Sequence, residues 1–287
     1  MARARARAAL VPDLLIEARR VASNVFAGWH GRRKRGIGED FWQFRPYVPG
    51  ENMAAIDWRR SARDEHVYIR DREWQATHMV WMWIDESSSM LFKSKDAIVP
   101  KQSRALVLCL ALCELLARSG ERLGFLGLTR PILSRKAAER IGEALSLAAP
   151  QTTLPSAEGV AANSDLVIFS DFLEEIDTLE TRLAGFARRG IRGHLVQIVD
   201  PAEELFPYEG RVEFVDPETG DKIVTGSAGS VQADYAALFS SHAARIRALA
   251  TALGWSYTQH HTDKPASQAL AALHIHMSQG ERRERGL

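Results

Sequence analysis

The sequence predicts an α/β fold in which a doubly wound, mostly parallel sheet is flanked by helices. One observation is an unbroken apolar run of strand length, Met79 to Ile84, which ends in Asp85. A second is the alternation of similar short apolar runs with segments of helical periodicity. No apolar stretch approaches the roughly 18 residues of a membrane-spanning helix, which excludes a membrane-spanning fold. Strands that alternate with helices in this way pair in parallel and are covered on both faces.

Each element follows from a local pattern. The expected helix over 101–118 has an apolar stripe and is ended by Gly120. The expected strand over 165–169 is followed by a second acidic residue, Asp171. Turn-forming residues at 216–221 indicate an inserted β-hairpin over 211–224. The other expected strands are 122–129, 194–199 and 255–259, and the other expected helices are 135–147, 178–189, 233–253 and 267–276.

Composition excludes several classes of protein. The 287 residues are 46% hydrophobic and 25% charged, which excludes collagen-like and wholly disordered chains. Cys109 and Cys113 are too few for a disulfide framework, and their spacing places both on one helix face as small apolar residues. The formal net charge of +1 provides no global attraction to nucleic acid or membranes. We expect a cytoplasmic protein without a transmembrane segment, and peripheral attachment to the inner face of the membrane is the alternative.

Basic residues are concentrated at the N-terminus. Residues 1–37 contain nine basic and only two acidic residues. Pro12 and these acidic residues interrupt the apolar core that a secretory signal requires, so export is not expected. We expect a solvated, partly disordered arm with an amphipathic helix near 14–25. Binding of nucleic acid or anionic lipid through this arm is the alternative.

The segment after the first core strand has the spacing D-x-S-x-S. Alternate residues of a tight loop point the same way, so Asp85, Ser87 and Ser89 can direct three oxygens to one point. Asp171 follows another apolar strand, and the carboxyl ends of parallel strands meet at one edge of the sheet. Carboxylate and hydroxyl oxygens are suitable ligands for a hard divalent cation. A simpler interpretation is that these residues only cap a helix.

This pattern resembles a von Willebrand factor A domain. In that family the D-x-S-x-S loop, a threonine from a second loop and an aspartate from a third form a metal-ion-dependent adhesion site. The resemblance implies that Asp85, Ser87, Ser89 and Asp171 bind Mg²⁺ or Mn²⁺. Thr152 or Thr153 lies in the right order to supply the threonine, and we favour Thr153.

A second resemblance covers the segment before the first core strand. It rests on Gly36, Gly38, Phe41, Arg45, Tyr47, Pro49, Gly50, Ile56, Asp57, Trp58, Ser61, Ala62 and Arg63. These residues resemble the signature of the bacterial family called domain of unknown function 58 (DUF58). Its members look like von Willebrand A domains with this preceding segment and are often encoded beside MoxR-type AAA+ ATPases. Together the resemblances span 36–273, with departures at Glu51, where aspartate is usual, and at Ala54 or Ala55, where arginine is usual.

Residues 56–63 combine an aspartate, a tryptophan and several arginines. One interpretation is a structural clamp in which Asp57 pairs with Arg63 or Arg45 beneath Trp58. The other is a docking surface, because exposed aromatic and arginine side chains favour binding hot spots. Tyr47 joins these four residues as a candidate for interaction with a partner.

The expected organisation has four parts. They are a basic N-terminal arm or helix (1–35), a family segment packed on the main domain (36–76), a von Willebrand A-like domain with its inserted hairpin (77–276), and a tail (277–287).

The leading functional hypothesis is a metal-dependent protein-interaction module rather than an enzyme. A divalent cation held partly by neutral hydroxyls can accept an aspartate or glutamate from a partner protein. The family resemblance suggests that a MoxR-type AAA+ ATPase or its client is this partner, in a chaperone-like role that matures another complex. An Mg²⁺-dependent phosphoryl-transfer enzyme using Asp85 is an alternative, although Ser87 occupies the position where haloacid-dehalogenase-type phosphatases carry a second aspartate.

Overall fold

The computed structural model describes residues 2–30, 43–48, 51–64, 66–71 and 78–284. The chain divides into two compact units. The main unit comprises Met1–Ala27 with Met79–Leu287, and the inserted unit comprises Gly28–His78.

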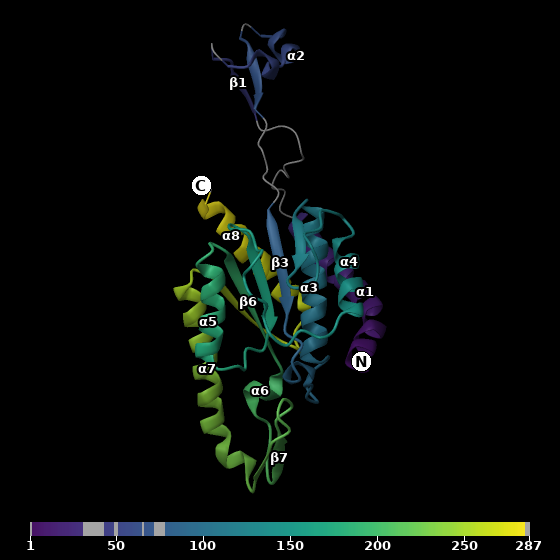
Figure 1. Ribbon diagram of the computed structural model, residues 1–287, viewed down its shortest axis with the longest axis vertical. Coiled ribbons are helices and arrows are strands. Elements are labelled where there is room, and N and C mark those ends of the chain that lie inside the picture. Colours follow the sequence, from purple (N-terminus) through teal and green to yellow (C-terminus); the bar gives the residue numbers. More distant parts are fainter. Residues whose placement is uncertain (1, 31–42, 49–50, 65, 72–77, 285–287) are drawn as a thin grey trace. The chain divides into compact units, whose positions relative to one another are not determined.

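A five-stranded sheet forms the centre of the main unit (Figure 1). Its order is β4-β3-β5-β6-β9, and all four neighbouring pairs are parallel. The strands are β3 (Met79–Ile84), β4 (Arg122–Phe125), β5 (Asp165–Ser170), β6 (Arg192–Val199) and β9 (Ser256–His261). The chain passes from β3 to β4 on one side and returns to β5 on the other, so strand order reverses beside β3. Ligands of open α/β sheets bind outside the carboxyl ends of strands at such a point.

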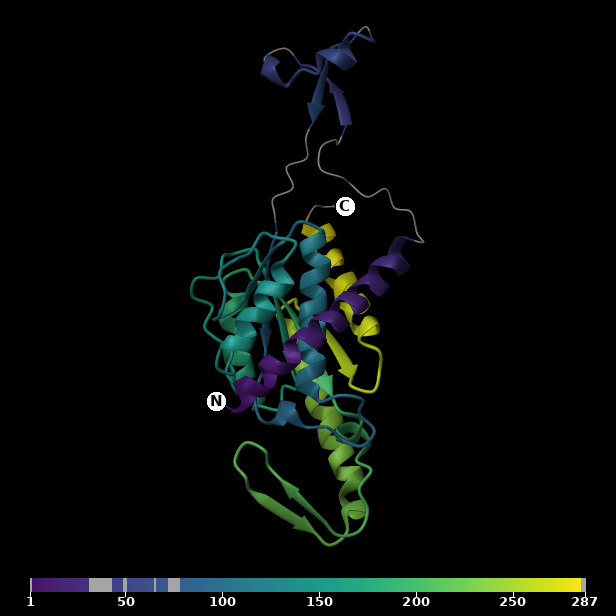
Figure 2. The same cartoon turned by 90° about the vertical axis from the view of Figure 1, so that its right-hand side faces the viewer.

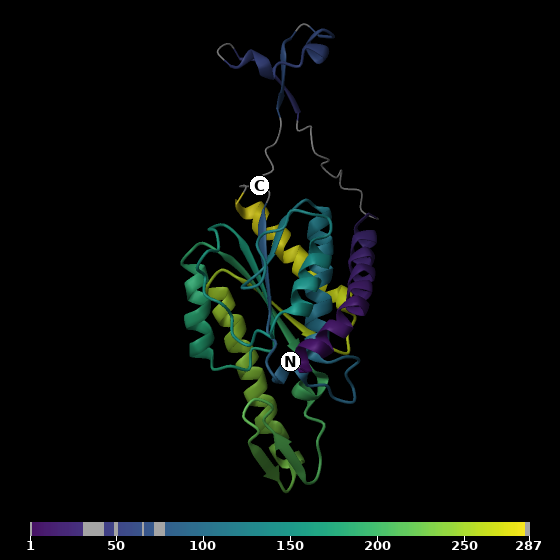
Figure 3. The ribbon, with the colours of Figure 1, turned by 45° about the vertical axis from the view of Figure 1, so that its right-hand side comes forward.

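Helices cover both faces of this sheet, which confirms the expected α/β class. On one face lie α3 (Lys101–Arg118), α4 (Ala137–Leu147) and α8 (Ala266–Glu284), and on the other lie α5 (Ile176–Ala187) and α7 (Gln232–Ala252) (Figures 2 and 3). The central strands are apolar because they are buried on both sides. Gly193 on β6 is required by one close approach, since a Cβ there would lie 1.8 Å from the Trp255 ring.

The N-terminal helix α1 (Ala2–His30) extends well beyond the expected 14–25 and packs on α3 and α4 (Figure 3). Its buried stripe repeats at helical spacing, with Leu14, Ala18, Val21 and Val25 in the core. Arg19 Nε donates to Glu114 Oε1 at 3.1 Å and also pairs with Glu139. The expectation of a partly disordered arm is therefore wrong for the described part of this segment.

Two other boundaries differ from the sequence prediction. The helix expected to end at His276 continues as α8 to Glu284, and Met277 is buried, so a tail does not begin at residue 277. The strand expected over 122–129 ends at Phe125. Phe125 N donates to Thr129 Oγ1 and Gly127 has φ +72°, so a tight turn ends β4.

The inserted hairpin is confirmed and lies beyond the carboxyl edge of the sheet (Figure 1). It consists of β7 (Val212–Val215) and β8 (Lys222–Thr225), which pair in antiparallel orientation. The short helix α6 (Pro201–Leu205) precedes it, and a 3₁₀ helix, η3 (Ala228–Val231), leads from it into α7. A second 3₁₀ helix, η2 (Ser89–Leu91), follows the D-x-S-x-S loop.

The inserted unit contains the antiparallel strands β1 (Gln43–Pro46) and β2 (Tyr68–Asp71), with η1 (Met53–Ala55) and α2 (Trp58–Ser61) between them. Ile56 and Ile69 are its buried apolar residues among those described. Within the described ranges, no helix of the protein combines the length and apolar character needed to cross a membrane.

Candidate functional site

A cleft of about 920 Å³ lies at the carboxyl edge of the sheet. Four predicted metal ligands line it, namely Asp85, Ser87, Ser89 and Asp171. Much of the remaining wall is apolar or aromatic and comes from α5, α6, α7 and the hairpin. The structure therefore brings together the side chains that the sequence predicted from two separate strands.

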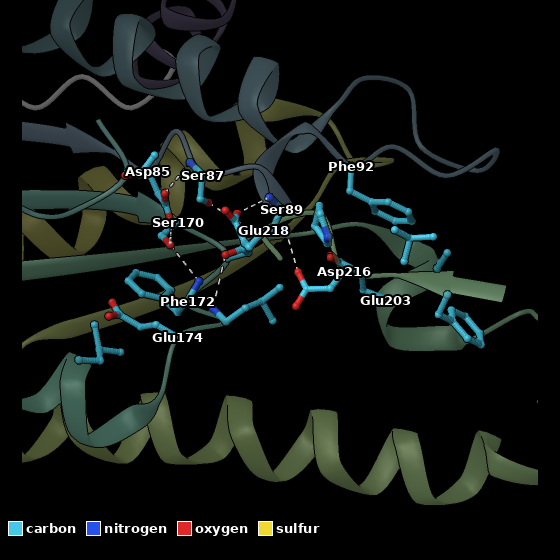
Figure 4. A pocket seen from close by; sticks show the side chains of 18 of the residues that line it. Asp85, Ser87, Ser89, Phe92, Ser170, Phe172, Glu174, Glu203, Asp216 and Glu218 are labelled. Atoms are coloured by element: carbon cyan, nitrogen blue, oxygen red, sulfur yellow. Dashed lines mark hydrogen bonds between the residues drawn. The ribbon is translucent and has the colours of Figure 1, made fainter. Parts of the chain in front are cut away.

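Asp85 is held in one orientation by two hydrogen bonds. Its Oδ1 accepts from Ser87 N at 2.8 Å, and its Oδ2 accepts from Ser170 Oγ at 2.8 Å (Figure 4). Ser170 Oγ in turn accepts from Phe172 N at 2.9 Å, so the serine hydroxyl has a fixed direction. Burial, together with the nearby charge of Asp171, raises the pKa of Asp85 in spite of these hydrogen bonds. Two carboxylates that repel each other in a cleft favour the binding of a cation between them.

The two serine hydroxyls of the loop point together. Ser87 Oγ and Ser89 Oγ are hydrogen-bonded to each other at 3.0 Å. In octahedral coordination with metal–oxygen distances of about 2.1 Å, neighbouring ligand oxygens are about 3 Å apart. This pair of hydroxyls therefore has the spacing of adjacent ligands of Mg²⁺.

Asp171 already interacts with a cation from the protein itself. Lys101, the first residue of α3, is fully buried, and its Nζ donates to Asp171 Oδ2 at 2.8 Å. The same ammonium donates to Glu203 on α6. Burial alone would lower the pKa of Lys101, but the two carboxylates raise it above its ordinary value. Only Oδ1 of Asp171 points away from this ion pair, and it accepts from Leu173 N at 3.4 Å.

The loop that carries the candidate threonines is attached to the D-x-S-x-S loop. Buried Glu86 accepts from Gln151 N at 3.0 Å, and Glu86 N donates to Gln151 O at 2.9 Å. Thr152 lines the cleft, whereas the favoured Thr153 is not among the residues that line it.

The interaction candidates lie in the inserted unit. Asp57 Oδ1 accepts from Arg60 N at 2.9 Å and caps α2, and no ion pair joins Asp57 to Arg63 among the described residues. Trp58 is 64% exposed. The clamp that the sequence suggested between Asp57 and Arg63 is therefore wrong, because the carboxylate satisfies a free N–H of the helix terminus instead.

The other interaction candidates in this unit differ in burial and in their hydrogen bonds. Arg63 is exposed, and Tyr47 is half-buried with its hydroxyl donating to Glu51 O at 3.4 Å. The side chain of Arg45 lies outside the described residues, as do Gly36, Gly38, Phe41, Pro49 and Gly50. Glu51, which departs from the family pattern, accepts from Val48 N at 3.0 Å.

Sequence reasoning missed Ser170, Lys101, Glu203 and Glu218 as members of the site. Ser170 could have been found, because it immediately precedes Asp171 at the end of a strand. Lys101 and Glu218 carry no comparable signal, since each reaches the site only through the tertiary fold.

The donor chemistry fits a hard divalent cation. Among the described residues no group of three or more His, Cys, Asp and Glu side chains could hold a metal ion. The candidate set is of another kind, with carboxylates from Asp85 and Asp171 and hydroxyls from Ser87, Ser89 and Thr152. Oxygen donors of this type suit Mg²⁺ or Mn²⁺ and are poor ligands for soft metals.

A comparison with protein families matches residues 43–245 to the model described as "Protein of unknown function DUF58". The proteins Rv1480 of Mycobacterium tuberculosis H37Rv and Mb1516 of Mycobacterium bovis, both named uncharacterized, are each 26% identical over 262 residues. These alignments cover 83% of this chain and 80% of each relative.

Two solved structures also resemble the chain. An aerotolerance-related membrane protein of Bacteroides fragilis has a TM-score of 0.39 at 17% identity. The conserved hypothetical protein BatB of Bacteroides thetaiotaomicron has a TM-score of 0.34 at 15% identity. Each comparison covers 70% of this chain and 99% of the other.

Proposed function

This chain belongs to the DUF58 family of proteins of unknown function, and we propose that it is a von Willebrand A-like, metal-dependent protein-interaction module. A divalent cation held by Asp85, Ser87, Ser89, Thr152 and Asp171 would bind an aspartate or glutamate of a partner protein.

The observation that carries this proposal is the pair of serine hydroxyls 3.0 Å apart beside the Asp85 carboxylate. Hydroxyl ligands are neutral, so a bound Mg²⁺ or Mn²⁺ would keep much of its positive charge. A carboxylate from outside the site is the natural group to compensate that charge. The cation would supply electrostatic attraction, while the fixed orientation of Asp85 would set the direction from which the carboxylate approaches.

Asp171 would contribute less to metal binding than Asp85 does. Because Lys101 holds its Oδ2, only Oδ1 is available to face the cation. Asp171 would therefore contribute one oxygen or act through a bound water, and Asp85 would be the principal charged ligand. Lys101 would hold Asp171 in place through this contact.

The rest of the cleft indicates what surrounds the partner's acidic residue. Trp83, Leu154, Phe206 and Tyr235 contribute apolar wall to the same cleft. A partner that places an apolar or aromatic side chain next to its aspartate or glutamate would use both parts of the cleft. A MoxR-type AAA+ ATPase or its client, acting in the cytoplasm or at the inner face of the membrane, is the partner we propose on the basis of the family resemblance.

The test is calorimetric titration of the full chain with Mn²⁺ and with Mg²⁺. We expect Asp85→Asn to lower the Mn²⁺ affinity by at least tenfold. Asp96→Asn is the matched control, because Asp96 is an exposed loop aspartate outside the cleft. Equal Mn²⁺ binding by the wild type and Asp85→Asn would reject this metal site, and absence of Mn²⁺ binding to the wild type would reject the proposed function.

Metal dependence of partner binding is tested separately by capture from native lysate. Wild type in Mg²⁺, wild type in EDTA and Asp171→Ala in Mg²⁺ are compared. We expect a specific partner in the first sample alone. Capture of the same proteins in all three would reject the cleft as the binding surface.

A further inference from the structure

The tip of the inserted hairpin is a preformed turn that carries Asp216, Glu218 and Asp221. Asp216 Oδ1 accepts from Glu218 N at 2.7 Å and from Thr219 N at 3.4 Å. Gly220, with φ +80°, donates its N–H to Asp216 O at 2.9 Å. Glycine adopts this left-handed conformation without strain. The turn therefore holds its own shape, and it does not depend on the site for its conformation.

Glu218 extends from this turn to the D-x-S-x-S loop. Its Oε1 accepts from Ser89 N at 2.9 Å, although the two residues are 129 positions apart in the sequence. Figure 4 shows the Glu218 side chain beside Ser87 and Ser89, within the cleft region that also contains Asp85. A carboxylate of this protein thus already lies next to two proposed metal ligands.

The base of the hairpin is attached to the main unit by contacts that do not involve the tip. The Phe214 ring stacks on Phe206 with centroids 5.5 Å apart, and Tyr208 meets Phe214 edge-on at 5.4 Å. Ala228 N donates to Gly210 O at 2.7 Å and closes the base. By contrast, Pro217, Glu218 and Thr219 at the tip are exposed. The tip can therefore leave Ser89 while the base remains in place.

The hairpin tip adds negative charge to a cleft that is already acidic. Glu218, Asp216 and Asp221 of the tip line the same cleft as Asp85 and Asp171. Additional carboxylates repel those of the cleft, so the approach of Glu218 is favoured by a positive charge there. A cation at the proposed site would strengthen the contact between Glu218 and the loop.

We propose that Glu218 is an internal ligand that occupies the carboxylate-accepting position beside Ser89, so that a partner's acidic side chain binds by displacing the hairpin tip. This inference rests on the proposed function and adds the regulation of the same site. It also defines the partner's chemistry, which is an exposed acidic residue on a turn or loop tip that can replace Asp216–Glu218.

An internal ligand has a predictable effect on affinity. A tethered group competes at an effective concentration of the order of millimolar for short connections. The apparent dissociation constant of an external ligand equals its intrinsic value divided by the fraction of molecules in which the site is free. If the tip occupies the site in about 90% of molecules, its removal increases external affinity about tenfold.

The test uses the full chain and a defined probe. The probe is a fluorescent peptide with the sequence of residues 212–225, and its binding in Mn²⁺ is followed by fluorescence anisotropy. We expect Glu218→Gln to bind this peptide about tenfold more tightly than the wild type does. Glu209→Gln, which changes an exposed glutamate preceding β7, should bind it as the wild type does. A probe carrying glutamine at the position of Glu218 should bind to no variant.

Hydrogen exchange gives a second readout that needs no metal. Because Ser89 N donates to Glu218 Oε1 and a glutamine oxygen could still accept this bond, the exchange experiment uses Glu218→Ala. We expect Glu218→Ala to increase exchange in residues 87–92, whereas Glu209→Ala should not. Equal exchange in the wild type and Glu218→Ala, or equal peptide affinity in the wild type and Glu218→Gln when both bind Mn²⁺, would overturn the internal-ligand proposal and leave the metal site intact. Failure of both proteins to bind Mn²⁺ would instead reject the proposed function, and the internal ligand with it.

Discussion

Lys101 Nζ lies 2.8 Å from Asp171 Oδ2 in the interior of the protein, and the two residues are 70 positions apart in the sequence. The lysine also pairs with Glu203, so one buried ammonium of α3 contacts both α6 and the residue that follows β5. This ion pair links the carboxylate predicted as a metal ligand to the element that precedes the hairpin.

Removal of this ammonium is expected to destabilise the main unit strongly. Lys101→Met leaves two carboxylates without their cation, and breaking a buried ion pair from one side costs about 3–5 kcal/mol. Urea unfolding of the full chain measures the change in the free energy of unfolding. Lys95→Met is the control, because Lys95 is exposed and surface substitutions change stability by about 0.5 kcal/mol or less. Similar losses of the free energy of unfolding in the two variants would show that the buried ion pair stabilises the protein no more than an exposed lysine does.

Ser170 is expected to set the metal affinity through Asp85 without binding the metal itself. Its hydroxyl donates to Asp85 Oδ2, and loss of a partner that orients a ligand typically lowers metal affinity by about 10–100-fold. We expect this reduction for Ser170→Ala in Mn²⁺ titrations. Ser164→Ala is the matched control, since Ser164 is also buried but donates to Ala161 O at the opposite end of β5. An unchanged Mn²⁺ affinity in Ser170→Ala would contradict the orienting role.

His260 is expected to make stability depend on pH. It is buried, and burial, reinforced by the charges of Arg104 and His261, lowers its pKa to about 3, while Asp263 acts in the opposite direction. In the unfolded chain its pKa is about 6.5. Between these values the unfolded state binds a proton that the folded state does not, so the free energy of unfolding falls as pH decreases, by about 1.4 kcal/mol per pH unit.

Urea unfolding of the wild type and His260→Gln at pH 6 and pH 4 isolates this contribution. The wild type should lose about 2–3 kcal/mol more than His260→Gln does over this interval. An equal decrease in the free energy of unfolding of the two proteins between pH 6 and pH 4 would mean that His260 takes up its proton in the folded state.

Most of the sheet and its helices could be predicted because their signals are local. Met79–Ile84 is apolar throughout since β3 is buried on both faces, and the periodicity of α3 reflects its own buried stripe. Errors occurred at boundaries such as the end of β4, where the hydroxyl of Thr129 competes for the N–H of Phe125. The length of α1 was underestimated, since the helix continues through Pro12 and spans Ala2–His30.

The sequence by itself determined the α/β alternation, the inserted hairpin and the presence of Asp85, Ser87, Ser89 and Asp171 at the ends of two apolar strands. These features depend on side-chain periodicity and turn chemistry, which act over a few residues. Only the tertiary structure decided that Thr152 lines the cleft, that Lys101 pairs with Asp171, and that Glu218 contacts Ser89. Such contacts join residues far apart in the chain, and they arise from strand order and packing, which no local pattern specifies.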